Sequence, residues 1–445
     1  MTRPLEGLRV VDAATILAGP FAASILGEFG ADVVKVEQPG VGDPMRRLGT
    51  AGPDGDTWWW LSDTRNKVSV ELDLRTDEGA GRFRDLVASA DVLIENYRTG
   101  TMERWGLGFE SLRESNPGLV QLSVSGYGRT GPMATTAGVA RIAEAFTGMA
   151  HLTGEPDGAP GLSGSSGLAD YLAGLYGALG VLLAIRAREA SGRGQLVDVA
   201  LYDGVARILD ELVPVHVATG VGRERMGPDT HRSVPHSNYR TATGDWVTIA
   251  CTNDRMFDRL AEVMGRSDLL DDERFVTNAS RITNREEVNM VVGDWVAGTP
   301  LDEVIAGCEA AAVPVGLVQT VGQYLEHPQV AARDSVVTVD HPTVGPVTVS
   351  GVVPRLVDTP GLIETLGAVL GGTTVDEVLE RWRGALYGAT TTGETPLCGS
   401  SPRSSWTCRR GRVPWRPRSS GPAPPRWIGR SRIHGRTSRR CGRPA

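Results

Sequence analysis

The segment SSGLADYLAGLYGALGVLLAI, residues 165–185, places one carboxylate, Asp170, at the start of an apolar, glycine-rich stretch. An aspartate that opens a helix is commonly an N-cap residue. Peptide N–H groups at a helix N-terminus also stabilise anions, so the same carboxylate can stay ionised and act as a nucleophile. From these residues alone, Asp170 is interpreted as either a cap or a nucleophile.

Glycines recur at every third position of this segment, at Gly174, Gly177 and Gly180. Because glycine has no Cβ, such a helix can approach another backbone closely. We therefore expect a buried helix over about residues 170–190, with its N-terminal end as the functional one. Backbone N–H groups at that end also suit an oxyanion that forms nearby.

Other catalytic signatures are weak. Glu37 lies where a ribose-binding acid would follow a βαβ opening, but the first turn, AATILAGP, lacks the G-x-G-x-x-G of dinucleotide-binding proteins. The sequence has neither a P-loop nor a G-x-S-x-G elbow. The seven histidines show no metal-ligand spacing, so we expect no metal site. Cys251 is interpreted as a buried small apolar residue, and His151 and His236 as structural or surface residues.

The elements that must position Asp170 follow an α/β pattern. Strands are predicted at 7–14, 32–37, 68–74, 91–96, 119–128 and 195–201, and helices between them at 19–29, 77–90, 109–116 and 202–212. Short connections between alternating strands and helices favour parallel pairing. The predicted fold class is therefore α/β, with a Rossmann-like parallel sheet.

The chain divides into four predicted parts. Residues 1–212 form a large α/β domain, and residues 213–334 form a linker and a smaller α+β domain. Residues 335–390 return to the large domain, starting with two strands. Within the second part we predict a loop at 213–235, a hairpin at 237–251 and helices at 254–264, 286–297 and 301–312.

Residues 391–445 form a tail rich in Arg, Pro and Ser, with no helical or strand period. From Cys398 onward it holds 13 arginines and no lysine or acid, so the remaining 33 basic and 53 acidic residues give positions 1–397 a net charge of −20. Such residue types arise when a GC-rich gene is translated in a shifted frame, and we interpret the tail as aberrant. A disordered interaction tail is the alternative.

Composition limits the classes of partner and compartment. The acidic body disfavours nucleic-acid binding, which only the basic tail would support. The N-terminus MTRPLEGLRVVD runs straight into a strand-like segment, and no apolar run approaches the roughly 18 residues of a membrane span, so we expect a cytoplasmic protein without a membrane partner. The body keeps only Cys251 and Cys308, which argues against disulfides.

Four ordered segments, residues 7–47, 66–79, 93–132 and 167–205, resemble class III CoA-transferases of the formyl-CoA transferase and carnitine CoA-transferase type. The likeness extends over about residues 5–360. It implies a two-domain fold in which two chains interlock as a homodimer, with a CoA thioester as substrate and no tightly bound cofactor. The aspartate of GLAD matches the family's nucleophile, so the resemblance favours Asp170 as the residue that carries CoA in an aspartyl-CoA thioester.

The resemblance also carries CoA contacts to this chain, in LDLRT, ENYR and MERWG. Arg75 and Arg104 suit the phosphates through charge-assisted hydrogen bonds, and Tyr97 offers a ring face for packing. The matching positions are Leu72, Arg75, Asn96, Tyr97, Arg98 and Arg104.

Several positions depart from the formyl-CoA transferase pattern. Leu17 replaces a catalytic glutamine, Gln38 an arginine and Thr99 a proline, while ACTNDRMF at 250–257 replaces a run of glycines. Formyl and oxalate substrates are therefore disfavoured. An acyl-CoA racemase on the same fold is the alternative, but its acid/base His-Asp pair is matched here by Val139 and Ala140.

The segments LAGPFAASILGEFGADVVKVE, GDPMRRLGT, VPHSNYRT and WVTIACTNDRMFDRLAEVM are most similar to the branch that moves CoA from succinyl-CoA to malate or citramalate. A dicarboxylate needs a cation for its distal carboxylate. Candidates for that role are Arg46, Arg47 and Arg141.

Overall fold

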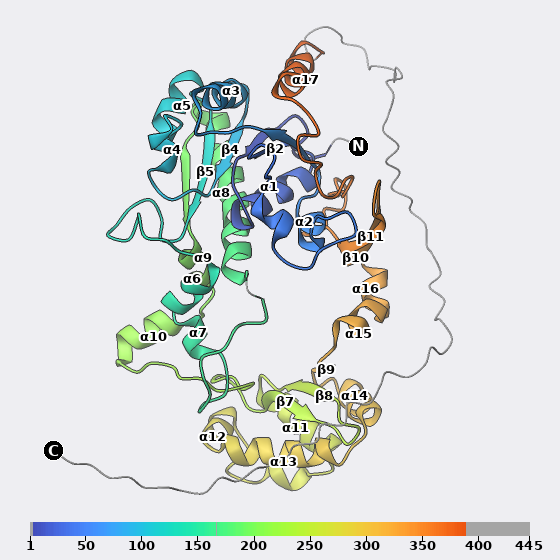
Figure 1. Ribbon diagram of the computed structural model, residues 1–445. Helices are drawn as coiled ribbons and strands as arrows, with labels where there is room; N and C mark the ends of the chain where they lie inside the picture. Colours follow the sequence, from blue (N-terminus) through green and yellow to red (C-terminus); the bar gives the residue numbers. More distant parts are fainter. Residues whose placement is uncertain (1–2, 166, 389–445) are drawn as a thin grey trace, which may run out of the picture. The chain divides into compact units, whose positions relative to one another are not determined.

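The largest sheet confirms the predicted parallel α/β architecture. The computed structural model describes residues 3–165 and 167–388 (Figure 1). All six strands pair in parallel in the order β3-β2-β1-β4-β5-β6, which is the order of doubly wound folds. The strands are β1 (Arg9–Asp12), β2 (Asp32–Glu37), β3 (Lys67–Glu71), β4 (Val92–Glu95), β5 (Val120–Ser125) and β6 (Leu196–Ala200).

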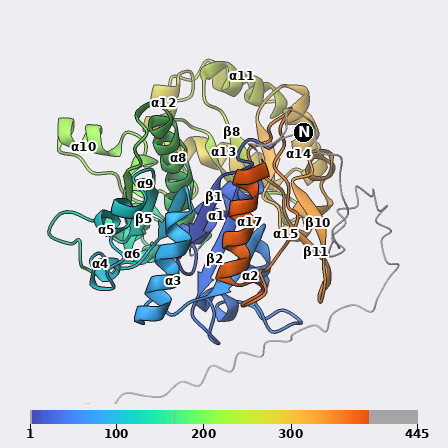
Figure 2. The ribbon, with the colours of Figure 1, turned by 90° about the horizontal axis from the view of Figure 1, so that it is seen from above.

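Helices cover both faces of this sheet, because alternate strand residues point to opposite sides. Val10 and Val33 join one apolar core with α1 (Ala18–Glu28), α8 (Leu168–Ser191) and α9 (Leu201–Arg207). Val11 and Val34 join a second core on the other face. That core includes α3 (Asp77–Ala88), α5 (Phe109–Ser115) and α17 (Val375–Gly388), with α3 and α17 side by side in Figure 2.

A second, antiparallel sheet has the strand order β7-β8-β9. β7 (His236–Arg240) and β8 (Trp246–Ala250) form the predicted hairpin, and β9 (Val315–Leu317) pairs with β8. Buried side chains of these strands share a core with α11 (Asp254–Val263), α13 (Arg285–Ala297) and α14 (Leu301–Ala310). These three helices match the predicted ones closely.

Residues after 335 contact the main sheet again. β10 (Val336–His341) pairs antiparallel with β11 (Gly345–Ser350). Further on, the Trp382 indole Nε1 of α17 donates to Asp32 Oδ2 at 2.9 Å, which ties the helix to β2. The predicted tail at 391–445 lies outside the described residues.

The loop predicted at 213–235 is partly wrong, because residues 212–219 are helical. α9 ends at Arg207, Asp210 adopts a left-handed φ of 48°, and α10 (Leu212–Thr219) follows. Pro214 stands in the first turn of α10, where a backbone N–H has no partner within the helix, so the proline is tolerated. The sequence also left several short elements unpredicted: η1 (Pro44–Arg47), α2 (Trp58–Asp63), α4 (Thr101–Arg104), α6 (Ala140–Phe146), α7 (Met149–Leu152), η2 (Ser267–Leu270), α12 (Asn278–Thr283), α15 (Val321–Glu326) and α16 (Pro328–Ala332).

α8 differs from its prediction in burial. By length and composition it is the one helix of the described residues that could cross a membrane, whereas the sequence suggested no such run. It packs against α1, β5 and β6, as a helix of the α/β layer does. Its opposite face is open, with Leu179 51% and Leu183 62% exposed, so the expectation of a fully buried helix was wrong.

Candidate active site

Asp170 lies in the first turn of α8 and is not its N-cap. Gly167 holds the N-cap position and supplies no side-chain hydrogen bond. The cap interpretation of Asp170 is therefore wrong in its strict form, while the carboxylate still lies where the helix dipole favours negative charge.

The glycines of α8 allow the close approach predicted for them. A Cβ on Gly174 would lie 2.8 Å from the backbone oxygen of Ala18 in α1. Cβ atoms on Gly177 and Gly180 would lie 2.7 Å from Leu122 and 2.6 Å from Val197, on β5 and β6. These distances are shorter than van der Waals contact, so only glycine lets α8 pack at this depth.

A strained loop brings the start of α1 against the start of α8. Ile16 has a left-handed φ of 65°, which is costly for a β-branched residue. Its N–H donates to both carboxylate oxygens of Asp43, at 3.1 and 3.2 Å, and Asp43 is paired with Lys35 Nζ at 3.1 Å. The next residue, Leu17, is buried so close to Gly167 that a Cβ there would lie 2.7 Å from Leu17 Cδ2.

Aromatic residues fix the same turn of α8 from another direction. The Tyr171 hydroxyl donates to Asp63 Oδ2 at 2.8 Å, and the Trp59 indole Nε1 donates to the same oxygen at 2.9 Å. The Phe21 ring meets Tyr171 edge-on, with 4.8 Å between the ring centroids. The backbone that carries Asp170 is thus held by α1, α2 and the loop before α1.

Burial, together with the smaller effect of the nearby Glu144 carboxyl group, raises the pKa of Asp170 from 3.8 to about 6. At neutral pH most Asp170 side chains are therefore ionised, yet each is more basic than an ordinary aspartate. Glu144 lies on α6 and is itself buried. Glu144 is not predictable from the sequence, because nothing in ARIAEAF distinguishes it from a surface residue.

The positions predicted to bind CoA all follow the carboxyl ends of β3 and β4, where ligands of doubly wound folds bind. Asn96 joins the β4 end to the loop after β1: it accepts from Thr15 N at 2.7 Å and donates to Thr15 O at 2.6 Å. Tyr97 packs edge-on against Trp105, with 5.0 Å between the ring centroids. Leu72 is half-buried beside β2, where its N–H donates to Glu37 O at 2.9 Å.

The three arginines predicted to contact CoA are exposed. Arg75 is held by Asp73 through two hydrogen bonds of 2.8 and 2.7 Å, and Arg104 donates to Thr101 Oγ1 at 2.9 Å. Arg98, directly after Tyr97, is exposed as well. The structure thus leaves these guanidinium groups within reach of solvent.

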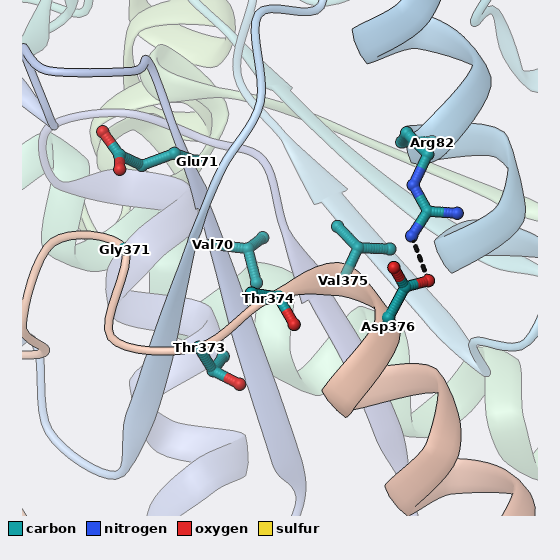
Figure 3. A pocket seen from close by; sticks show the side chains of 8 residues that line it. All are labelled: Val70, Glu71, Arg82, Gly371, Thr373, Thr374, Val375 and Asp376. Carbon is teal, nitrogen blue, oxygen red and sulfur yellow. Dashed lines mark hydrogen bonds and ion pairs between the residues drawn. The ribbon is translucent and has the colours of Figure 1, made fainter.

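A cavity of about 290 Å³ adjoins the β3 end of this region (Figure 3). It forms where residues 371–376 pass β3 and α3, and the ion pair of Arg82 with Asp376 lies on one side of it. Asp170 does not line this cavity. Its lining residues are Val70, Glu71, Arg82, Gly371, Thr373, Thr374, Val375 and Asp376.

The three arginines predicted for the distal carboxylate differ in their surroundings. Arg46 is buried, and its guanidinium donates to Glu37, Asp56 and the Ala368 carbonyl, so its donors are already engaged. Arg47 is bonded to the Val41 carbonyl. Arg141 is exposed on α6 and makes no hydrogen bond or ion pair with the residues that the structure describes.

Thiol and metal chemistry find little support in the described part of the chain. Cys251 and Cys308 are free and buried, and burial raises the pKa of Cys251 to about 12, which disfavours its thiolate. Within residues 3–165 and 167–388 no three His, Cys, Asp or Glu side chains group as a metal site would require. At the positions of the racemase pair, Val139 and Ala140 carry no proton to transfer.

Comparison with known proteins decides between the remaining families. A model of CoA-transferase family III matches residues 5–371. The chain belongs to CoA-transferase family III. The resemblance stated from the sequence is thereby confirmed: the protein is a class III CoA-transferase, an enzyme that moves CoA between acyl-CoA thioesters and carboxylates.

Relatives of this CoA-transferase are similar to it in sequence or structure over most of its length. The succinyl-CoA–L-malate CoA-transferase alpha subunit of Chloroflexus aurantiacus is 47% identical over 378 residues, covering 85% of this chain and 88% of that protein. The succinyl-CoA–D-citramalate CoA-transferase of the same organism is 41% identical over 369 residues, covering 83% and 92%. A CAIB/BAIF family protein from Brucella suis has a similar structure, with a TM-score of 0.76, 33% identity, and coverage of 86% of this chain and 100% of that one.

Proposed function

We propose that this CoA-transferase takes CoA from succinyl-CoA and passes it to a hydroxydicarboxylate of the malate or citramalate type, with Asp170 as the nucleophile. One observation carries the proposal. A half-buried carboxylate lies in the first turn of a glycine-packed helix, and its pKa of about 6 makes it ionised but basic at neutral pH. The names of two relatives supply the substrates.

The reaction requires only exchange of acyl bonds. A carboxylate oxygen of Asp170 attacks the thioester carbonyl carbon, the C–S bond breaks, and a mixed anhydride and CoA thiolate form. The thiolate then attacks the side-chain carbonyl carbon of Asp170, releasing succinate and leaving an aspartyl-CoA thioester. The acceptor carboxylate repeats both steps in reverse order, so no proton and no electron is gained or lost. N–H groups at the start of α8 stabilise the oxyanions.

CoA binding is assigned to the strand ends. Tyr97, packed on Trp105, gives a rigid aromatic edge beside the β4 end. The exposed guanidinium groups of Arg75, Arg98 and Arg104 suit the CoA phosphates. Asn96 fixes the loop that leads to Leu17, so it joins the CoA region to the nucleophile.

Arg141 is the residue we assign to the distal carboxylate of the substrates. It lies one turn from Glu144 on α6, which neighbours Asp170, and unlike Arg46 it makes no hydrogen bond or ion pair with the described residues. We expect Arg141→Met to reduce kcat/KM for succinate and malate far more than for a monocarboxylate such as propionate. Arg113→Met, on α5, is the control. Equal losses for both acid classes would remove Arg141 from the substrate site.

We also propose that the enzyme is an interlocked dimer. Leu175, Leu179 and Leu183 form an open apolar face on α8, and Val213 and Val217 are exposed on α10. Contiguous exposed apolar residues of this kind mark interfaces. Since one relative is named as an alpha subunit, light scattering of the purified chain should distinguish a homodimer from a chain that needs a second, related subunit.

The proposed nucleophile is tested by Asp170→Asn, which keeps the side-chain shape and removes the charge. CoA exchange from succinyl-CoA to malate should fall below detection while the Tm changes by only a few degrees. An exchange rate within tenfold of the unaltered enzyme would contradict the covalent mechanism.

A further inference from the structure

Glu144 is a buried carboxyl group to which the proposed reaction gives no task. It lies on α6, its residue is only 2% exposed, and its Oε1 atom is buried without a hydrogen-bond partner. A carboxyl group in such surroundings is costly to retain unless a nearby group needs it.

The nearby group is the first turn of α8, because α6 packs against α8 and Ala143, next to Glu144, shares a buried core with Ala169. The backbone N–H of Ala169 acts on the Glu144 carboxyl group and lowers its pKa, although burial raises that pKa overall. α8 has no side-chain cap of its own, because Gly167 occupies the N-cap position. Glu144, which belongs to a different helix, therefore provides an acceptor for a backbone N–H at the uncapped start of α8. That N–H belongs to Ala169, the residue before Asp170.

We propose that Glu144 is a positioning residue for the nucleophile: it holds the first turn of α8 and sets a second negative charge beside Asp170. This inference rests on the proposed function of Asp170. Two neighbouring carboxylates repel each other, and the repulsion ends when Asp170 becomes a neutral anhydride or thioester. Glu144 thereby destabilises the resting carboxylate relative to the covalent intermediates and makes Asp170 the stronger nucleophile.

Other titratable groups face this pair from the elements packed against it. Arg141 on α6 lowers the pKa of Glu144, so it partly offsets the effect of burial. Tyr171 is bound to Asp63 and stays a neutral phenol, because burial and that carboxylate raise its pKa. Four further groups on packed elements have their own partners: Glu28 of α1 on Arg65, His151 of α7 on Glu224, Asp198 of β6 on the Arg129 backbone and Asp203 of α9 on Tyr202. Arg207 of α9 is exposed and makes no hydrogen bond or ion pair within the described residues.

The pH dependence of kcat/KM for CoA exchange tests this role. In the unaltered enzyme the acid limb should have its midpoint near the pKa of Asp170, about 6. Glu144→Gln keeps an oxygen for the Ala169 N–H but removes the charge, so the midpoint should move to lower pH. The plateau above the limb should fall by up to about tenfold for each pH unit of that move.

Three further variants make the outcome decisive. Glu144→Asp keeps the charge, so the midpoint of its acid limb should equal that of the unaltered enzyme. This variant can be measured even where Glu144→Gln folds poorly. Glu144→Ala should show the shifted limb and a lower Tm than Glu144→Gln. Glu189→Gln, at the exposed far end of α8, should have the same acid-limb midpoint and the same Tm as the unaltered enzyme. An unmoved limb in an active Glu144→Gln enzyme would overturn the proposal for Glu144, whereas an active Asp170→Asn enzyme would overturn the proposed function itself.

Discussion

Replacing Gly174 by alanine tests whether the depth of α8 positions the nucleophile. The added Cβ would lie 2.8 Å from the Ala18 carbonyl oxygen and 2.9 Å from Phe21 Cδ1, against an ordinary contact of about 3.5 Å. The carbonyl belongs to the backbone of α1, so the two helices must separate by about 0.7 Å. Overpacking of this kind costs about 1–3 kcal/mol, from which the better helix propensity of alanine recovers about 1 kcal/mol.

Gly81→Ala is the matched control. Gly81 lies within α3, and a Cβ there would meet nothing within 4 Å, so this variant should gain the propensity alone. The free energy of unfolding in urea should therefore be about 1–3 kcal/mol lower for Gly174→Ala than for Gly81→Ala. Because a misplacement near 1 Å can cost up to about 100-fold, kcat should fall about tenfold in Gly174→Ala alone. Equal stabilisation of both variants, with kcat unchanged, would refute this account of the α1–α8 contact.

Two further changes test the buried charges around the site. Lys35→Met leaves the Asp43 carboxylate buried without its cation, so the free energy of unfolding in urea should fall by about 3–5 kcal/mol. Arg113→Met, at an exposed ion pair, should lower it by at most about 1 kcal/mol. Similar losses for both variants would contradict the burial of Lys35. Burial raises the pKa of Glu28 from 4.5 to about 7, although its ion pair with Arg65 acts in the opposite direction. Between pH 4.5 and about 7 the folded protein therefore keeps a proton on Glu28 that the unfolded chain has lost. The stability of the fold consequently falls as the pH rises through this range. Glu28→Gln should remove this loss, so the stability of the variant relative to the unaltered enzyme should rise from about pH 5 to about pH 8, by up to about 3 kcal/mol; a difference that stays flat with pH would contradict the raised pKa.

The parallel sheet and the place of Asp170 were predictable because their signals are local. Strands β1 (RVVD) and β4 (VLIE), covered on both faces, contain short runs of consecutive apolar residues. The glycine spacing of α8 likewise predicts a close contact with another backbone, and the structure shows this contact between Gly174 and α1. Of the two interpretations of Asp170, the family motifs favour the nucleophile, and that role stays a prediction.

Tertiary packing decided what the sequence left open. α8 is apolar on nearly every side, so no amphipathic period told which face α1 would cover and which would stay exposed. Glu144 is far from Asp170 along the chain, and a single glutamate in a helical run is ordinarily a surface residue. Arg46 would look the same in sequence whether it met a substrate or, as here, Glu37 and Asp56.

The most direct measurement of the central claim is to trap the covalent intermediate. The enzyme is incubated with succinyl-CoA without an acceptor, quenched with borohydride or hydroxylamine, digested and analysed by mass spectrometry. The mechanism predicts one modified carboxyl group, at Asp170, together with release of succinate in proportion to enzyme, and neither in Asp170→Asn. Modification at another residue, or succinate exchange without any adduct, would contradict the assignment of Asp170 as the nucleophile.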